Sequence, residues 1–336
     1  MQPNKTLFFG IIGLAVVVVM GMFLAVFFFL DDTPALPTRQ ESVKIRVAAA
    51  PSIKDWATAA AQEFNRTNPR AQVEIIAADD LIPEAQFKLA NPQSQPPAAW
   101  LAEASFVVAM ARERGLSFEA DLRSVAGTSL AWGAFTDKQA QFNQKYGDLS
   151  WQTVHAKATA PDDFLTIVIA SPANRAEGLA ALVSATAAQL GKPNLTSSDV
   201  SQARPWLVET LKDNTRIPPQ PAEAFASTQG RSIGDMGLLS RAAWQRNNLH
   251  NRPEFSLTPV QPDVQLDYPL AIWSGSQSNQ ASQQAAAQFR DFLLSSNQQQ
   301  LLANFGLEPA GAVTTTVELD GPAAWALLRF AEQELR

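Results

Sequence analysis

The sequence predicts an α/β fold preceded by one membrane-spanning helix, and three observations predict it. A strand, a helix and a second strand follow one another with short links over 43–77. A strongly apolar strand candidate over 163–171 leads into a helix over 178–190. A long apolar run, 7–30, precedes both patterns. Strands that alternate with helices form sheets covered by helices on both faces.

The apolar run begins at Leu7, ends at Leu30 and contains no charged, amide or hydroxyl side chain. A helix over this run reaches roughly 36 Å, which spans a hydrocarbon core about 30 Å thick. Lys5 precedes the run and Asp31 follows it. The positive-inside rule therefore places residues 1–6 in the cytoplasm and the main domain outside the cell membrane.

A cleaved signal peptide is the alternative to this anchor. Its apolar core would be about 7–15 residues long and would end at a cleavage site of small residues. The run 7–30 is longer, and Phe29, Leu30 and Asp31 at its end form no such site. We therefore expect an uncleaved single-pass anchor, followed by a polar linker over 31–42 that contains two prolines.

The folded body opens with an alternating strand over 43–50 and an amphipathic helix over 53–68. A second strand over 71–77 makes the pair parallel with a right-handed crossover. The same patterns predict further strands over 98–101, 129–135, 163–171, 234–240, 255–260 and 268–273. They predict helices over 106–114, 178–190, 205–214, 241–248, 281–295, 298–304 and 323–335.

Composition excludes several classes of protein. Hydrophobic residues make up 46% of the chain and charged residues 17%, which supports a packed core. The chain has no cysteine, so disulfides, thiolate catalysis and cysteine-ligated zinc are excluded. The net charge is −6 and no basic stripe is present, which argues against a nucleic-acid partner. We expect no cofactor.

Several segments resemble the type 2 periplasmic solute-binding proteins, in particular extracellular relatives that sometimes precede a von Willebrand A domain. The segments are RVAAAPSIKDW from Arg46, FNRTNP from Phe64, PAAWLA from Pro97, YGDLSW from Tyr146, the stretch from Ser171 to Leu182, DYPLA from Asp267 and AQFRDFLLSSNQQQLLANFG from Ala287. Together they extend over about 43–309. Their order and spacing carry the resemblance.

The resemblance implies a two-lobed periplasmic-binding-protein type 2 fold with two crossover strands. It implies a ligand bound in the cleft between the lobes and captured by hinge closure. Mapped onto this chain, lobe one covers 43–130 plus 267–336, and lobe two covers 131–266.

A binder of this kind needs polar groups at strand ends and helix N-termini. Ser52 follows the first strand and precedes a helix, where it either contacts a ligand or caps the helix. Asp79 follows the second strand; with its neighbour it either binds a cationic group or belongs to a solvated turn. Tyr268 precedes a strand and either lines the cleft or packs in the core.

Asn174 and Arg175 stand at the start of the helix that follows the most apolar strand. The resembling family often has hydroxyl side chains there, and their absence argues against a sulfate-like or molybdate-like ligand. Arg175 either pairs with an anionic group through two N–H donors or is solvated beside the helix start. Ser232 and Asp235 belong to a glycine-flanked segment whose backbone can approach a ligand closely.

The sequence offers little support for an enzyme. The two histidines, His155 and His250, are far apart and fit no metal-binding spacing, and no G-x-S-x-G motif is present. We therefore expect a membrane-anchored solute-binding protein for a small polar ligand, serving an ABC-type importer or a sensing partner. The alternative is a structural or interaction module that kept the fold without ligand binding.

Overall fold

The computed structural model describes residues 42–89, 91, 94–312 and 316–335. The expected cytoplasmic N-terminus, anchor helix 7–30 and most of the linker 31–42 lie outside these residues. Among the helices that are described, none is long and apolar enough to cross a membrane. Most of the described residues belong to one compact unit that begins at Val43.

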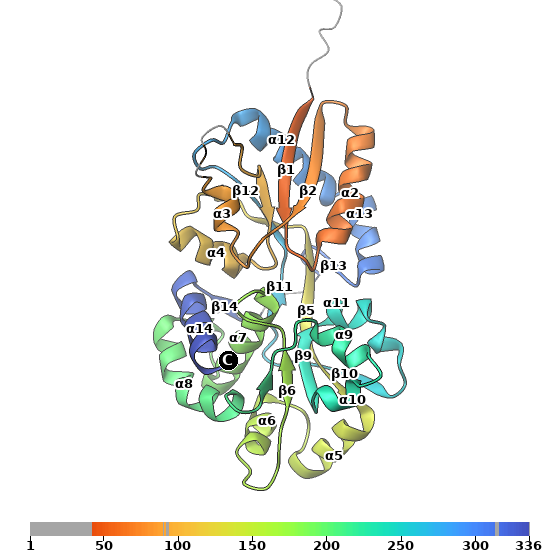
Figure 1. Cartoon of the computed structure of the whole chain (residues 1–336), viewed down its shortest axis with the longest axis vertical. Helices are drawn as coiled ribbons and strands as arrows, with labels where there is room; N and C mark the ends of the chain where they lie inside the picture. The colour runs from red at the N-terminus through yellow and green to blue at the C-terminus, as the bar shows by residue number, and fades with distance from the viewer. Residues whose placement is uncertain (1–41, 90, 92–93, 313–315, 336) are drawn as a thin grey trace, which may run out of the picture. The chain divides into compact units, whose positions relative to one another are not determined.

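Two sheets organise this unit, one in each lobe (Figure 1). The first has the strand order β2-β1-β3-β12-β4, and the second β10-β5-β9-β6-β8. The first sheet contains β1 (Val43–Ala49), β2 (Ala71–Ala77), β3 (Ala99–Leu101), β4 (Arg123–Ser124) and β12 (Pro269–Ile272). The second contains β5 (Ala126–Phe135), β6 (Ile167–Ile169), β8 (Thr215–Arg216), β9 (Met236–Ser240) and β10 (Phe255–Pro259).

Strand direction is mixed in both sheets. In the first, β1 is parallel to β2 and β3, and β12 is antiparallel to β3. In the second, β6 is parallel to β8 and β9, while β5 is antiparallel to β9 and β10. The structure therefore confirms the expected parallel pair over 43–77, and β12 returns the chain to the first sheet after β10 of the second.

The strand β5 connects the lobes. All ten of its residues are buried. Besides β9 and β10, it pairs at its N-terminal end with β11 (Gln265–Leu266) and β13 (Glu308–Pro309). A third, small sheet joins β7 (Asn194–Leu195) to β14 (Glu318–Leu319). The segments that cross between the lobes thus run side by side at one end of β5.

Helices cover the sheets of both lobes. On the first lobe these are α2 (Lys54–Thr67), α3 (Glu84–Phe87), α4 (Ser105–Glu113), α12 (Gln280–Leu293), α13 (Ser296–Leu301) and the 3-10 helix η2 (Leu302–Phe305). On the second they are α5 (Thr136–Tyr146), α6 (Trp151–Ala158), α7 (Ala176–Leu190), α8 (Ser197–Leu211), α9 (Pro221–Ala226), α10 (Gly230–Ile233), α11 (Arg241–Arg246) and the 3-10 helix η1 (Leu249–Asn251). The last helix, α14 (Gly321–Glu334), contacts α4 of the first lobe and α7 and α8 of the second.

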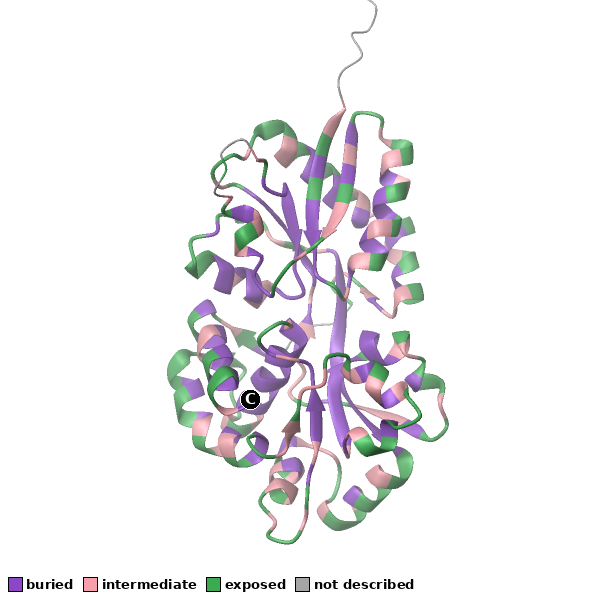
Figure 2. Cartoon of the chain, viewed as in Figure 1, coloured by how far each residue is buried: buried purple, intermediate pink, exposed green. Residues whose placement is uncertain are grey.

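The core lies along the strands and the inner helix faces, as Figure 2 shows for β3, β5 and β9. The most completely buried helix is α7, whose residues from Ala176 to Ala187 are all buried. This explains why its sequence is apolar on nearly every face. The expected lobe boundaries at 130 and 267 stay a prediction, and the contacts of α14 with both lobes place its segment at their junction.

Two local expectations were wrong, and two helices were missed. The strand expected over 163–171 is only Ile167–Ile169, because the preceding Phe164 is 92% exposed and the segment there is a loop. The helix expected over 205–214 is α8, which begins eight residues earlier because Thr196 and Asp199 form a capping box. The helices α5 and α6 were not expected, since only one or two residues of each are buried and their apolar period is weak.

Candidate functional site at the junction of the lobes

A buried carboxylate joins the two lobes. Glu103 follows β3 of the first lobe and is 5% exposed. Its Oε1 accepts hydrogen bonds from the Ser52 hydroxyl (2.5 Å) and the Arg175 Nε (2.9 Å). Its Oε2 accepts the backbone N–H of Ala176 at 2.7 Å. Arg175 and Ala176 begin α7, so the carboxylate of one lobe lies at the N-terminus of the central helix of the other.

The ion pair between Glu103 and Arg175 is close, and its carboxylate is shielded from water. A second nitrogen of Arg175, Nη2, lies 2.7 Å from the same Glu103 oxygen. Burial raises the pKa of Glu103, but the charge of Arg175 and the three hydrogen bonds outweigh it, so this pKa lies below its usual range. Glu103 in turn raises the pKa of Arg175. Both groups are therefore charged at neutral pH.

Local sequence explains why α7 can start so close to the end of β6. Gly178 lies in its first turn, and a Cβ there would be 2.2 Å from the carbonyl oxygen of Ala170 and 2.7 Å from the nitrogen of Pro172. Only glycine allows this approach of the helix to the end of β6. The carboxylate of Glu177 accepts the backbone N–H of Ser240 at 2.7 Å, which ties α7 to the end of β9.

Tyr268 completes the cluster from the crossover segment before β12. The residue is fully buried, and its backbone N–H donates to the carbonyl oxygen of Glu103. Its φ of 38° is rare for a residue with a side chain and marks local strain. Its hydroxyl has no hydrogen-bond partner among the described residues. Burial, followed by the charge of Glu103, raises its pKa, so the phenol is neutral.

A small cavity of about 110 Å³ lies beside this cluster. Its lining combines both lobes: Pro51, Ser52, Asp55, Trp56 and Phe305 from the first, and Arg175 and Arg246 from the second. Arg246, the last residue of α11, also donates from Nη1 to the carbonyl oxygen of Ser52 at 2.6 Å. The cavity therefore presents guanidinium, carboxylate and hydroxyl groups with two aromatic rings, a lining suited to a small polar molecule.

Three of the seven residues expected from sequence meet here: Ser52, Arg175 and Tyr268. Asn174 is exposed and precedes Arg175 without lining the cavity. Asp79 is also exposed. It follows the C-terminal end of β2, which lies beside the C-terminal end of β1, the strand that Ser52 follows. Of the two roles considered for Ser52, ligand contact and helix capping, the second is not seen: its hydroxyl donates to Glu103 and does not cap α2.

Ser232 and Asp235 lie elsewhere. Asp235 precedes β9, whereas Arg175 follows β6, and these two strands are parallel. The two residues therefore belong to opposite ends of the second sheet. The Asp235 carboxylate accepts the Thr166 N–H at 2.8 Å and lies 3.7 and 3.8 Å from Lys138 and Lys157. Ser232 is exposed, and its carbonyl oxygen accepts a hydrogen bond from Arg216.

Glu103 itself was not expected, although the sequence contains a signal for it. It is the one charged residue between Lys88 and Arg112, inside the apolar stretch PAAWLAEASFVVAMA. A lone carboxylate in such a stretch is rarely buried without a partner. The partner lies 72 positions away, so no local pattern reveals it.

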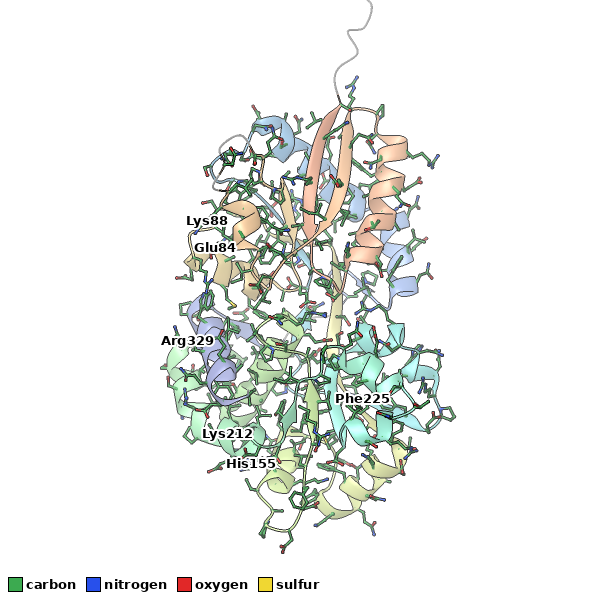
Figure 3. All side chains as sticks on the ribbon, in the orientation of Figure 1. Glu84, Lys88, His155, Lys212, Phe225 and Arg329 are labelled. Atoms are coloured by element: carbon green, nitrogen blue, oxygen red, sulfur yellow. The ribbon has the colours of Figure 1, made fainter. Side chains whose placement is uncertain are left out.

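Neither histidine belongs to this cluster. The Nδ1 of His155 lies 2.8 Å from the Thr210 hydroxyl, and its ring stacks on Trp206. Figure 3 shows His155 on the second lobe, away from the junction of the lobes. His250 is exposed in η1. Across the described ranges, no group of three histidine, aspartate or glutamate side chains is arranged to hold a metal ion.

Comparison with known proteins identifies the family. The family model of the bacterial extracellular solute-binding proteins matches residues 45–308. The chain belongs to this family. Its members bind solutes and are not enzymes. No sequence among curated proteins matches the chain.

Solved structures show the same two-lobed periplasmic-binding-protein fold. Iron-bound HitA from Pseudomonas aeruginosa is 15% identical, with a TM-score of 0.60 over 87% of this chain and 99% of that one. AfuA from Actinobacillus pleuropneumoniae, with fructose-6-phosphate bound, is 16% identical, with a TM-score of 0.60 over 87% and 98%. The sulfate-binding protein SubI from Mycobacterium tuberculosis is 13% identical, with a TM-score of 0.56 over 87% and 91%. At these identities the likeness establishes the fold alone.

Proposed function

We propose that this solute-binding protein captures a small polar ligand between its lobes, at the cavity beside Glu103, and presents it to an ABC-type importer or a sensing partner. The observation that carries the proposal is the cavity itself, because polar groups of both lobes line it. A ligand that contacts both lobes favours the closed arrangement over the open one, which is the basis of hinge capture. The sulfate-binding protein SubI, a periplasmic thiamin binding protein and iron-bound HitA share the fold, which supports a transport role.

The proposal includes the membrane. The run 7–30 would hold the protein in the cell membrane as a single-pass anchor, with the binding domain outside. The linker 31–42 reaches at most about 40 Å when extended. The domain would then work close to the membrane surface, within reach of a permease. The relation to relatives that precede a von Willebrand A domain stays a prediction.

A thermal-shift screen of the full-length chain in detergent tests ligand binding. Sugars, oxyanions, amino acids and polyamines are compared, since a ligand that binds the folded state raises the unfolding temperature by mass action. We expect one class to raise it in the wild type and to lose most of the effect in R246A, which removes a lining guanidinium. R231A is the matched control, because Arg231 pairs with Asp137 outside the cavity.

A screen without any shift would favour the alternative, a module that kept the fold without ligand binding. The Glu103–Arg175 ion pair supports this alternative, because a carboxylate of the chain itself already occupies the hydrogen-bond donors at the start of α7.

The anchor has its own test. N-terminal sequencing of the protein from isolated membranes should return Met1 or the residue after it. A mature chain that begins near Thr33 would refute the uncleaved anchor.

A further inference from the structure

The contacts between the lobes at the start of α7 converge on one carboxylate. Glu103 belongs to the first lobe, while Arg175 and Ala176 belong to the second. Two hydrogen bonds and one ion-pair contact cross from the second lobe and end on Glu103. The hydrogen bonds come from the Arg175 Nε and the Ala176 N–H, and the ion-pair contact from the Arg175 Nη2. A further cross-lobe bond at the cavity, from exposed Arg246 to the Ser52 carbonyl, has a neutral acceptor. Arg241 of α11 also donates to the carboxylate of Glu308 on β13 at 3.3 Å, and both of these side chains are more exposed than Glu103.

The place that Glu103 occupies is the one an anion would take. The first N–H groups of a helix have no partner within the helix and attract negative charge. The helix α7 has fifteen residues, and no side chain of its own caps its N-terminus. An arginine at the N-cap adds a fork of N–H donors beside the free backbone N–H. In this chain the donors of Arg175 and Ala176 are satisfied by a carboxylate from the opposite lobe.

We propose that Glu103 is a built-in anion that closes the lobes in the absence of ligand and excludes anionic ligand groups from the start of α7. The Ser52 hydroxyl orients the carboxylate from its own lobe, and Arg175 and Ala176 hold it from the other. Opening the lobes separates Glu103 from its cation and returns both charges to water. The closure does not depend on the proposed function; the exclusion of anionic groups does, because it concerns the ligand of the same cavity.

Distances between two spin labels, measured by pulsed electron resonance on the full-length chain in detergent, test the closure without a transported ligand. Since the chain has no cysteine, Q62C and Q144C introduce two unique labelling sites. Both positions are exposed, Gln62 on α2 of the first lobe and Gln144 on α5 of the second. We expect one narrow distance distribution in the otherwise wild-type chain.

In this background, E103A should move the main peak to a longer distance, beyond the width of the wild-type peak. Sodium acetate should restore the shorter distance, because acetate supplies the missing carboxylate to the space that the substitution leaves. Sodium chloride at the same ionic strength should not. E103Q keeps the size of the side chain without its charge and should also lengthen the distance, with no response to acetate. D137A is the matched control, since Asp137 pairs with Arg231 within the second lobe.

The outcomes separate clearly. An E103Q chain with the wild-type distance overturns the proposal, and this variant carries the test if E103A does not fold. A longer distance in E103A that acetate leaves unchanged also overturns it, because lost packing would then be the cause. A broad or long distance distribution in the labelled chain that keeps Glu103 also overturns the proposal. Failure of the ligand screen would leave all these distances unchanged, so the closure stands or fails independently of the proposed function.

Discussion

The two ends of the second sheet carry polar clusters of similar composition and opposite character. At one end, Glu103 is buried against a cation and a helix N-terminus and joins two lobes. At the other end, Asp235 is 31% exposed and lies about 3.7–3.8 Å from Lys138 and Lys157, all within one lobe. The comparison shows that the presence of charged residues does not by itself identify a functional site. What distinguishes the two clusters is how deeply the carboxylate is buried and whether its partners come from the same lobe or from the other one.

The largest difference in unfolding free energy should appear between the loss of a cation from a buried ion pair and the loss of one from an exposed ion pair. R175A leaves Glu103 buried without its charge partner, which typically costs about 3–5 kcal/mol. Urea unfolding monitored by tryptophan fluorescence measures the loss. R231A serves as the exposed counterpart, because both members of its ion pair are more than half exposed. The comparison would collapse if R175A cost no more than R231A.

A substitution in the packing that positions α7 should come next. G178A places a methyl group 2.2 Å from a backbone oxygen, and overpacking of this kind costs roughly 1–3 kcal/mol. At the other end of the sheet, the nearest atom to a Cβ at Gly234 is a methyl of Val168 at 2.7 Å, a side chain that can adjust. G234A should therefore cost less. Thermal unfolding of both variants would show this order, and the reverse order would contradict the tight packing at Gly178.

A third carboxylate, on the crossover segment, shows burial without a cation close at hand. Burial, followed by the charge of Glu308, raises the pKa of Asp263 to about 6; the backbone N–H of Val264 and, less strongly, the charge of Arg241 offset this only in part. In the unfolded chain this pKa is about 3.9, so the folded state holds the proton more tightly and loses stability as the pH rises from about 4 through 6. D263N removes that cost. It should raise the unfolding free energy by about 1 kcal/mol at pH 8, after allowance for solvent screening, and by nothing at pH 4.

Unfolding curves of D263N and the wild type at the two pH values measure the difference between them. An equal effect at both would show that the change in hydrogen bonding, and not the charge, is responsible.

The smallest effect is expected at the exposed end of the second sheet. D235N removes the charge that faces Lys138 and Lys157 and keeps an oxygen for the Thr166 N–H. Partly exposed pairs at such distances contribute about 0.5 kcal/mol or less. A loss above roughly 2 kcal/mol in urea unfolding would place this cluster in the same class as Glu103 and remove the contrast.

Sequence patterns predicted the elements whose burial is periodic. The strands β1 and β2 and the helices α2, α7 and α12 were predicted within two residues of their ends, because each presents a regular apolar face or is buried throughout. The helices α5 and α6 were missed because few of their residues are buried. The ordered set of family-like segments supplied the two-lobed fold, which periodicity alone does not contain.

The site was predicted less completely than the fold. Ser52 and Arg175 stand at helix starts, and Tyr268 precedes a strand, so local rules selected them. Ser232 and Asp235 satisfied a local rule too, but strand direction places them at the opposite end of the sheet. Glu103 follows a strand without any motif, and its role depends on a helix in the other lobe. Contacts between distant segments are the information that a single sequence does not display.

The pairing around β5 has a mechanical consequence. Near the crossover, β5 pairs with β13 at Ala126–Gly127 and with β11 at Thr128–Ser129, so the connection between the lobes is a hydrogen-bonded ribbon in which β5 has a partner strand at each of these positions. Bending such a ribbon within its own plane would stretch the bonds between its strands, whereas bending or twisting it out of the plane leaves them intact. The connection is therefore stiff against displacement of the lobes within the plane of the strands and compliant to rotation of the lobes out of that plane.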